Sequence, residues 1–192
     1  MADRNPGDRA IGIRIAAVGH RDAGDEARAA AVRSVLASIL GVCPGSSREQ
    51  VAAPGVILSS LAEGADRLVA RVGLEFPGVD LHALLPLAPE DYRRDFASAA
   101  SRAEFDALLA RASSVEVLPP ADTREAAYVN AGRVLVDRCD AVVAIWDGGP
   151  ARGPGGTADV VAYAREKGRP LHWILSGDPS RIVVERLETG SG

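Results

Sequence analysis

Six short apolar runs alternate with longer amphipathic segments along this chain, and no other feature of the sequence restricts its fold as much. This rhythm is typical of βαβ units, in which buried strands alternate with helices that cover the sheet. The expected strands span residues 13–18, 56–59, 79–85, 114–118, 141–146 and 170–175. The expected helices span residues 25–40, 63–76, 89–111, 123–138 and 157–167. Right-handed crossovers then predict an α/β fold: a Rossmann-like, doubly wound, mainly parallel sheet of about six strands with helices on both faces.

The length and composition are those of one globular domain. The chain has 192 residues, of which 47% are hydrophobic and 25% are charged, so a sizeable core is expected. We expect a disordered lead-in over residues 1–10, the Rossmann-like domain over residues 11–176 and a C-terminal tail over residues 177–192. The apolar stretch at residues 182–184 lies in this tail, and the sequence does not assign its structure.

Charge and hydropathy restrict the partners. The chain carries 22 basic and 26 acidic residues, a net charge of −4, and its longest basic run is the pair Arg93-Arg94. Because non-specific nucleic-acid affinity comes mainly from clustered basic charge, this argues against a nucleic acid as partner. No apolar stretch approaches the roughly 20 residues that cross a bilayer, and the polar start lacks the apolar part of a signal peptide. We therefore expect no membrane partner and a cytoplasmic protein.

Cysteine and histidine placement gives no sign of a metal site. Cys43 and Cys139 lie far apart without companion ligands, and no third ligand accompanies His82 and His172. We expect no metal and no cofactor. Pairing of sheet edges or packing of helices would allow a homodimer.

The segment after the fifth expected strand, residues 146–159, is the strongest candidate for binding. Ligands of doubly wound sheets bind beyond the carboxyl ends of strands, at the point where the strand order reverses. Glycines let backbone N–H groups approach an anion closely, and the start of a helix favours a phosphate. The candidate ligand-binding residues here are Asp147, Gly148, Gly155, Gly156 and Thr157. The alternative is a flexible surface loop without a ligand.

The turn after the first strand contains Gly19, His20 and Arg21. It lies where the first phosphate turn of a dinucleotide fold would be, but it lacks the full G-x-G-x-x-G spacing, so no ordinary NAD site is expected. Arg21 can form bidentate bonds to phosphate, and His20 can donate or accept one bond. The alternative is that His20 caps the strand and Arg21 pairs with Asp22 or Asp25.

The turn after the second strand offers further candidates. Ser60 either contacts a ligand or caps the next helix, and Gly64 is small enough for a ligand to lie close to it. Asp66 either hydrogen-bonds a ribose, fixes Arg21, or is a solvated acid of the first helical turn. After the third strand, Tyr92 is a candidate to close over a base, although a charged first helical turn explains its surroundings without a ligand.

Taken in order, these turns resemble the motifs of the SLOG superfamily. The resemblance spans roughly residues 13–175 and is carried by residues 19–21, 62–66, 85–87, 139–148 and 155–157. This Rossmann-like group contains the Lonely guy phosphoribohydrolases, the DNA-processing protein A family and nucleotide-sensing domains. The resemblance implies that the chain binds nucleotides or their derivatives, such as nucleoside monophosphates, ADP-ribose-like molecules or cyclic nucleotide signals.

The catalytic part of the resemblance differs from the family pattern. In Lonely guy enzymes a segment P-G-G-x-G-T-x-x-E ends in a glutamate that helps to break the N-glycosidic bond. Here the residue three after Thr157 is Val160, which cannot move a proton, and Asp159 lies about 100° round the helix from it. Residues 140–148 and 156–159 are also similar to nucleoside deoxyribosyltransferases, which use a carboxylate nucleophile, but no glutamate follows the loop suitably.

Three functions follow from these features. The first is a sensor or processing domain that binds a nucleotide or nucleotide derivative, with Arg21 at the phosphate and Asp66 near the ribose or base. The second is an N-glycosidase acting on nucleoside monophosphates, with Glu63 or Asp159 as the catalytic acid or base. The third is single-stranded DNA binding, as in the DNA-processing relatives, against which the acidic net charge argues.

Overall fold

The computed structural model describes residues 12–22, 26–42, 53–151 and 153–186. In chain order the elements are β1 (Ile13–Gly19), α1 (Glu26–Ile39), β2 (Gly55–Ser59), α2 (Ala65–Gly73), β3 (Val79–Leu85), α3 (Pro89–Tyr92), the 3-10 helix η1 (Arg93–Asp95), α4 (Ala99–Arg111), β4 (Ser114–Val117), α5 (Arg124–Arg138), β5 (Ala141–Trp146), α6 (Thr157–Glu166), β6 (Leu171–Leu175) and β7 (Ile182–Glu185). The predicted lead-in over residues 1–10, together with Asp25 and Cys43, lies outside the described residues.

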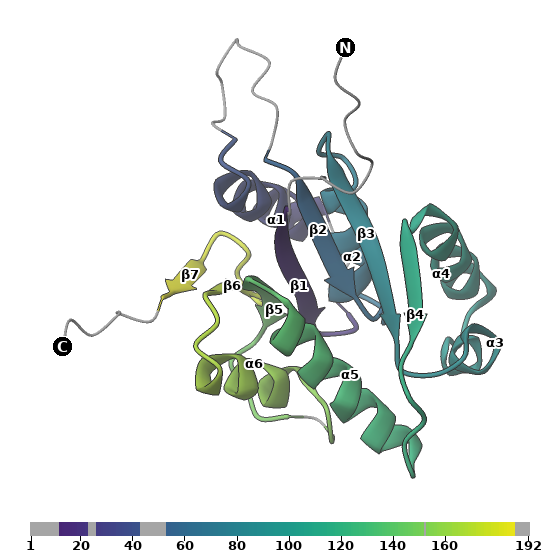
Figure 1. Cartoon of the computed structure of the whole chain (residues 1–192). Coiled ribbons are helices and arrows are strands. Elements are labelled where there is room, and N and C mark those ends of the chain that lie inside the picture. The colour runs from purple at the N-terminus through teal and green to yellow at the C-terminus, as the bar shows by residue number, and fades with distance from the viewer. Residues whose placement is uncertain (1–11, 23–25, 43–52, 152, 187–192) are drawn as a thin grey trace, which may run out of the picture.

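The strands form one sheet in the order β4-β3-β2-β1-β5-β6-β7 (Figure 1). Every neighbouring pair is parallel except β6 and β7, which are antiparallel. From β1 the chain builds outward through β2 to β4, and it then returns to place β5 on the other side of β1. This reversal between β1 and β5 is the point at which ligands bind in doubly wound sheets. The predicted α/β, Rossmann-like, mainly parallel architecture is confirmed.

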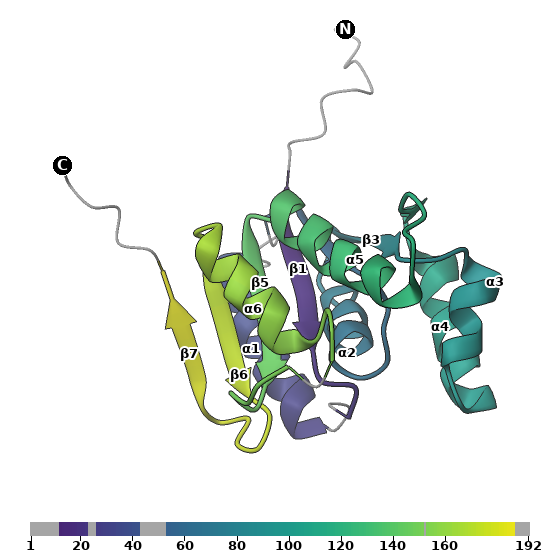
Figure 2. The ribbon, with the colours of Figure 1, turned by 90° about the horizontal axis from the view of Figure 1, so that it is seen from below.

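Helices cover both faces of the sheet, as Figures 1 and 2 show, with α5 and α6 on one face and α1 and α2 on the other. Successive side chains of β1 point alternately to the two faces of the sheet. Ile15 and Ala17 pack into the core under α1, α2 and α4, while Ala16 and Val18 pack into the core under α5 and α6. The alternation explains why the strand reads as a continuous apolar run.

The apolar run Ala141–Trp146 forms an interior strand, β5, in which all six residues are buried. It lies between β1 and β6, and its two faces are covered by different helices. A strand in this position has no solvent side, which is the physical reason for its lack of polar residues. The prediction that residues 141–146 form a central strand is confirmed, and so is the prediction of an edge position for the fourth strand.

The predicted single helix over residues 89–111 is wrong, because the chain breaks into α3, η1 and α4. Phe96 adopts an extended conformation after η1 and its side chain is 2% exposed. Ser98 then caps α4 by accepting a hydrogen bond from the Ser101 backbone N–H at 3.0 Å. Burial of the Phe96 ring and the cap at Ser98 together outweigh continuation of the helix.

The seventh strand lies in the segment that the sequence left unassigned. β7 pairs with β6 along the edge of the sheet, with Ile182 opposite Ile174. Glu185 at its end forms an ion pair with Arg165 of α6, with 2.7 Å between Arg165 Nη2 and Glu185 Oε1. The strand leaves Val184 48% exposed, so it covers the edge of β6 without adding a second buried face.

The described helices are short relative to a bilayer. The longest, α5, has 15 residues. No described helix is both long enough and apolar enough to cross a membrane.

Candidate functional site

A cavity of about 500 Å³ lies at the carboxyl ends of β1 and β5, where the strand order reverses. Its walls come from the turns after β1 and β2, from the glycine-rich segment after β5, and from α3 and α5. The polar and glycine residues that line it include Gly19, His20, Arg21, Ser60, Asp66, Tyr92, Glu125, Tyr128, Gly153, Gly155, Gly156 and Thr157. The structure therefore brings the turn at Arg21 and the segment 153–157 to one hollow, which has the size of a small-molecule site.

The turns after β1 and β2 interlock through two glycines. At Gly64 the φ angle is 80°, and a Cβ atom would lie 2.4 Å from the carbonyl oxygens of His20 and Arg21. At Gly19 a Cβ atom would lie 2.5 Å from the Cβ atom of Ala65. Larger residues would push the turns apart, so the glycines set the distance between Arg21 and the start of α2.

His20 is held in the cavity wall by the residue that follows β5. Its Nε2 atom lies 3.0 Å from Asp147 Oδ1 and 3.3 Å from the Asp147 backbone nitrogen. Asp147 Oδ1 also accepts a hydrogen bond from the Gly149 N–H at 2.8 Å. Asp147 does not line the cavity, and neither does Gly148, which packs against the ring of Trp173. Of these two predicted ligand-binding residues, Asp147 supports the site by holding His20, and Gly148 lies outside it.

Asp66 of α2 is a buried carboxyl group in the cavity wall, with its residue only 6% exposed. Burial raises the pKa of this carboxyl to about 7. Backbone hydrogen bonds from Ala62 and Ser60 and the charges of Arg67 and Arg21 oppose the rise without cancelling it. The side chain therefore changes its charge close to neutral pH, which is a property common at functional sites.

The backbone before α2 is strained at Leu61, the one described residue other than glycine with a positive φ, 56°. Ser59 Oγ accepts the Leu61 N–H at 3.0 Å, and Arg67 Nε donates to the Leu61 carbonyl at 2.9 Å. Such strain persists only where the surroundings hold it in place, and it clusters at ligand sites.

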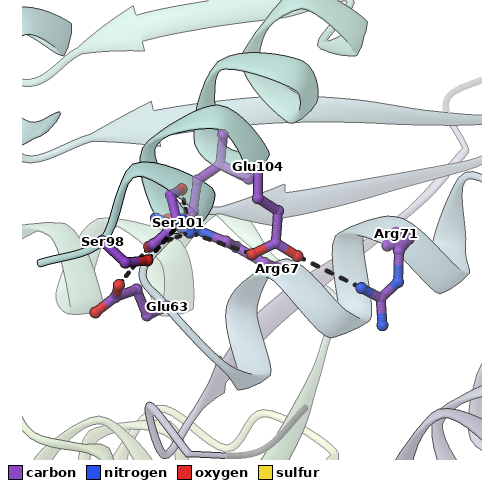
Figure 3. A network of polar contacts seen from close by, with 7 residues as sticks. Glu63, Arg67, Arg71, Ser98, Ser101 and Glu104 are labelled. Carbon is purple, nitrogen blue, oxygen red and sulfur yellow. Dashed lines mark hydrogen bonds and ion pairs between the residues drawn. The ribbon is translucent and has the colours of Figure 1, made fainter. Parts of the chain in front are cut away.

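Glu63, one of the two predicted catalytic carboxylates, lies outside the cavity. It accepts a hydrogen bond from the Ser101 hydroxyl on the side facing α4 (Figure 3). Arg67 joins the same network, donating from Nη1 to the Ser101 carbonyl and hydroxyl, both at 2.8 Å. Glu104 accepts from Arg67 and from Arg71 at 3.3 and 3.4 Å. This network binds the turn before α2 to α4.

The glycine-rich segment after β5 turns sharply and opens α6. At Gly155 the φ angle is 72°, and a Cβ atom would lie 2.8 Å from the backbone nitrogen of Val129. Gly156 is the N-cap of α6, and no side chain caps the helix there. Asp159, the second predicted catalytic carboxylate, accepts the Gly155 N–H at 3.1 Å and lies outside the cavity, in a smaller hollow between α5 and α6.

Two tyrosines, Tyr92 of α3 and Tyr128 of α5, also line the cavity. Tyr92 is 3% exposed, and burial raises the pKa of its hydroxyl, which therefore stays neutral. The Tyr128 hydroxyl donates to Asp95 and accepts from Arg124 Nε at 3.1 Å, and its pKa is raised to about 12, chiefly by burial. Arg124 also donates to the Asp91 carbonyl at 2.9 Å, which ties α3 to α5.

Sequence reasoning found the turns of this cavity better than its helical wall. Among the predicted ligand-binding residues, Gly64, Asp147 and Gly148 do not line the cavity. Glu125 of α5 and the apolar floor of Ala131 and Leu135 went unrecognised. Nothing in the pattern of an amphipathic helix marks which of its turns faces a ligand. No group of three or more His, Cys, Asp or Glu side chains is placed to hold a metal in the part of the chain that the structure describes.

Comparisons with known proteins bear on the fold. No protein-family model matches the chain, and no curated protein does. Among solved structures, it is similar to DNA processing protein A from Helicobacter pylori, a structure described for its unique single-stranded DNA binding mode. The TM-score is 0.54 at 16% sequence identity, over 84% of this chain and 65% of that one. The chain thus spans somewhat less than two thirds of that protein, and the similarity is one of Rossmann-like fold.

This similarity corrects one prediction about partners. The acidic net charge predicts that a nucleic acid is not a partner, but a protein with this fold binds single-stranded DNA. Net charge is a sum over the whole chain, whereas a phosphate responds to the local field of the few groups around it. The net charge of −4 therefore does not exclude a nucleic-acid partner.

Proposed function

We propose that this chain binds a nucleoside phosphate, either as a free nucleotide or as one unit of a single strand, with the phosphate at the start of α6. The observation that carries the proposal is the meeting of Arg21 with the glycine-rich segment 153–157 on one cavity of about 500 Å³.

The start of α6 supports an anion. Helices α4 and α5 begin with side-chain caps from Ser98 and Thr123. Helix α6 begins at Gly156, beside the cavity and without a side-chain cap, whereas the first amide of α2, the Ala65 N–H, donates to the His20 carbonyl at 3.0 Å. The first amides of a helix lack partners within it, and the helix dipole adds positive potential there. Arg21 adds a full positive charge and a fork of donors suited to phosphate.

Other residues that line the cavity suit a nucleoside. The partly exposed Tyr128 supplies aromatic surface, on which bases of any sequence can stack, and the buried Tyr92 packs beside it with 6.2 Å between the ring centroids. Ser60 also lines the cavity and supplies a hydroxyl group that can hydrogen-bond a sugar hydroxyl. The volume is in the range of sites that take one small ligand. These features favour one nucleotide unit in the cavity.

The nucleotide unit can come from a single strand or from a free nucleotide, and the salt dependence of the affinity distinguishes the two. DNA processing protein A, with which the chain shares its fold, is described as binding single-stranded DNA. A strand would place one unit in the cavity and further phosphates on the surface around it. Each additional neutralised phosphate steepens the loss of affinity with salt. A free nucleotide would show only a shallow dependence.

The test is calorimetric titration of the full chain with AMP and with a ten-nucleotide thymidylate, each at 50 and 200 mM salt. Arg21→Gln should weaken either ligand about tenfold to a hundredfold, the loss expected for a hydrogen-bonded charge. Thr157→Val keeps the shape and removes the hydroxyl, and should weaken binding less. Arg111→Gln is the matched control, because α4 ends there at the opposite, amino edge of the sheet.

The outcomes separate clearly. Tighter binding of the oligonucleotide with a steep salt slope assigns the site to a strand, and comparable or tighter binding of AMP assigns it to free nucleotides. If neither ligand binds, or if Arg111→Gln weakens binding as much as Arg21→Gln, the proposed function is wrong.

A further inference from the structure

Asp66 is an acidic side chain in the wall of a cavity that we assign to an anion. It is 6% exposed and lines the cavity together with Arg21 and Ser60. A carboxylate and a phosphate that share a poorly solvated hollow repel each other. An anion site built around such a residue needs either a distant phosphate or an uncharged carboxyl.

Charged and titratable groups surround Asp66 on several elements. Those that act on it or share its cavity are Arg21 and His20 from the turn after β1, Arg67 from α2, Tyr92 from α3, and Glu125 and Tyr128 from α5. The two arginines favour the charged carboxylate, and the buried Tyr92 hydroxyl stays neutral. Burial nevertheless raises the pKa of Asp66 to about 7. Protonated and ionised forms therefore coexist near neutral pH.

We propose that Asp66 sets the affinity and pH range of this pocket by taking up one proton from solvent when an anion binds beside it. This inference rests on the proposed function. The neutral carboxyl donates its O–H to an anion oxygen, so that one repulsive contact becomes a hydrogen bond. The balance is one anion and one proton bound, with no other change of charge at Asp66.

Linkage gives the sign and size of the effect. Binding that favours the protonated form is strongest at low pH and weakens as pH rises through the pKa of the free site. With that value near 7 and one proton taken up with the anion, affinity should fall about 25-fold between pH 6.5 and pH 8.5. The second ionisation of a phosphate monoester lies near pH 6, below this interval.

His20 is the competing explanation, because its side chain lines the same cavity. Its Nε2 atom lies 3.3 Å from the Asp147 backbone nitrogen, an acceptor position, and 3.0 Å from Asp147 Oδ1, a donor position. Protonation of His20 would also favour anions. The experiment must therefore separate the two residues.

The full chain is titrated with AMP and with a ten-nucleotide thymidylate at pH 6.5, 7.5 and 8.5, each in two buffers of different ionisation enthalpy. The difference between the binding enthalpies in the two buffers gives the number of protons taken up per ligand. This measurement needs only the wild-type protein. Asp66→Asn keeps the shape and cannot titrate, so its affinity should stay nearly constant over this interval. His20→Gln should retain most of the pH dependence.

Proton uptake near one per anion at pH 7.5 to 8.5, lost in Asp66→Asn and kept in His20→Gln, supports the proposal. Binding with the same pH dependence in Asp66→Asn overturns it and leaves the proposed function intact. Failure of both ligands to bind wild type and Asp66→Asn at every pH overturns the proposed function, and this inference with it.

Discussion

Asp66 shows how a single residue can link the stability of this protein to its site. The residue lies in the first turn of α2, where an acid complements the helix dipole, yet it is turned into the wall of the cavity. Burial outweighs the favourable amides and arginines, and the pKa rises from 3.8 to about 7. The ionised form thus costs folding free energy that an exposed aspartate would not cost.

Asp66→Asn should therefore stabilise the protein at pH 8 relative to wild type. Below pH 3.8 both the folded and the unfolded states are protonated, so the wild type bears no penalty. Between pH 3.8 and about 7 the unfolded state ionises first and wild-type stability falls, and above pH 7 the penalty is constant at roughly 4 kcal/mol. Urea unfolding at pH 5 and pH 8 measures the difference between variant and wild type.

The control for this effect is Asp122→Asn, which alters an exposed aspartate before α5. It should change the free energy of unfolding little, and equally at both pH values. An Asp66→Asn variant whose advantage is the same at pH 5 and pH 8 would show that Asp66 does not titrate between them in the folded protein.

At the scale of elements, the contact between α2 and α4 supports the site from the far side. Arg67 is 1% exposed, and its guanidinium lies 4.2 Å from the centroid of the Phe96 ring. Its donors reach the strained turn at Leu61 and the start of α4 at Ser101. One buried side chain thus links the break between α3 and α4 to the turn that carries Ser60.

Replacing Arg67 by Met should destabilise the protein by about 3–5 kcal/mol, because it leaves the Leu61 and Ser101 carbonyls without their donor and removes one of the two arginines that pair with Glu104. Arg71→Met, one turn along the same helix, removes an exposed partner of the same Glu104 and should cost less than about 1 kcal/mol. Chemical denaturation of both variants checks the difference. Equal losses would mean that the buried network adds nothing beyond a surface ion pair.

At the scale of the whole molecule, the two edges of the sheet differ. β4 ends one side as a short strand with Val115 and Val117 each 46% exposed. On the other side β7 covers the edge of β6, whose residues are otherwise paired only with β5. An uncovered strand edge offers backbone donors and acceptors to other chains.

A chain that ends at Ser180 should therefore be less stable and more prone to associate than one that ends at Arg186. Loss of the β7 ladder and of the Arg165–Glu185 ion pair should cost about 2 kcal/mol, which lowers Tm by about 4–8 °C in a domain of this size. Calorimetry and size-exclusion chromatography compare the two chains. Identical Tm values and elution volumes would show that β7 contributes neither stability nor edge protection.

The sequence by itself determined the class of fold and the order of its elements, because the periodicity of apolar residues is a local property. The run Ala141–Trp146 identified a strand without a solvent face, and Thr123 marked the start of α5. The glycines between strand and helix, Gly19 at the end of β1 and Gly155 before α6, identified the turns of the site for the same reason. The break after Tyr92 escaped notice, since it depends on burial of Phe96 by residues distant in the sequence.

Only the tertiary structure decided which side chains share the cavity. Glu63 and Asp66 are three residues apart on the same turn and helix, yet one bonds to α4 and the other lines the cavity. That division follows from how α2 packs between β1 and α4. The raised pKa of Asp66 has the same origin, because burial is a property of the packed chain and leaves no signature in the sequence around the residue.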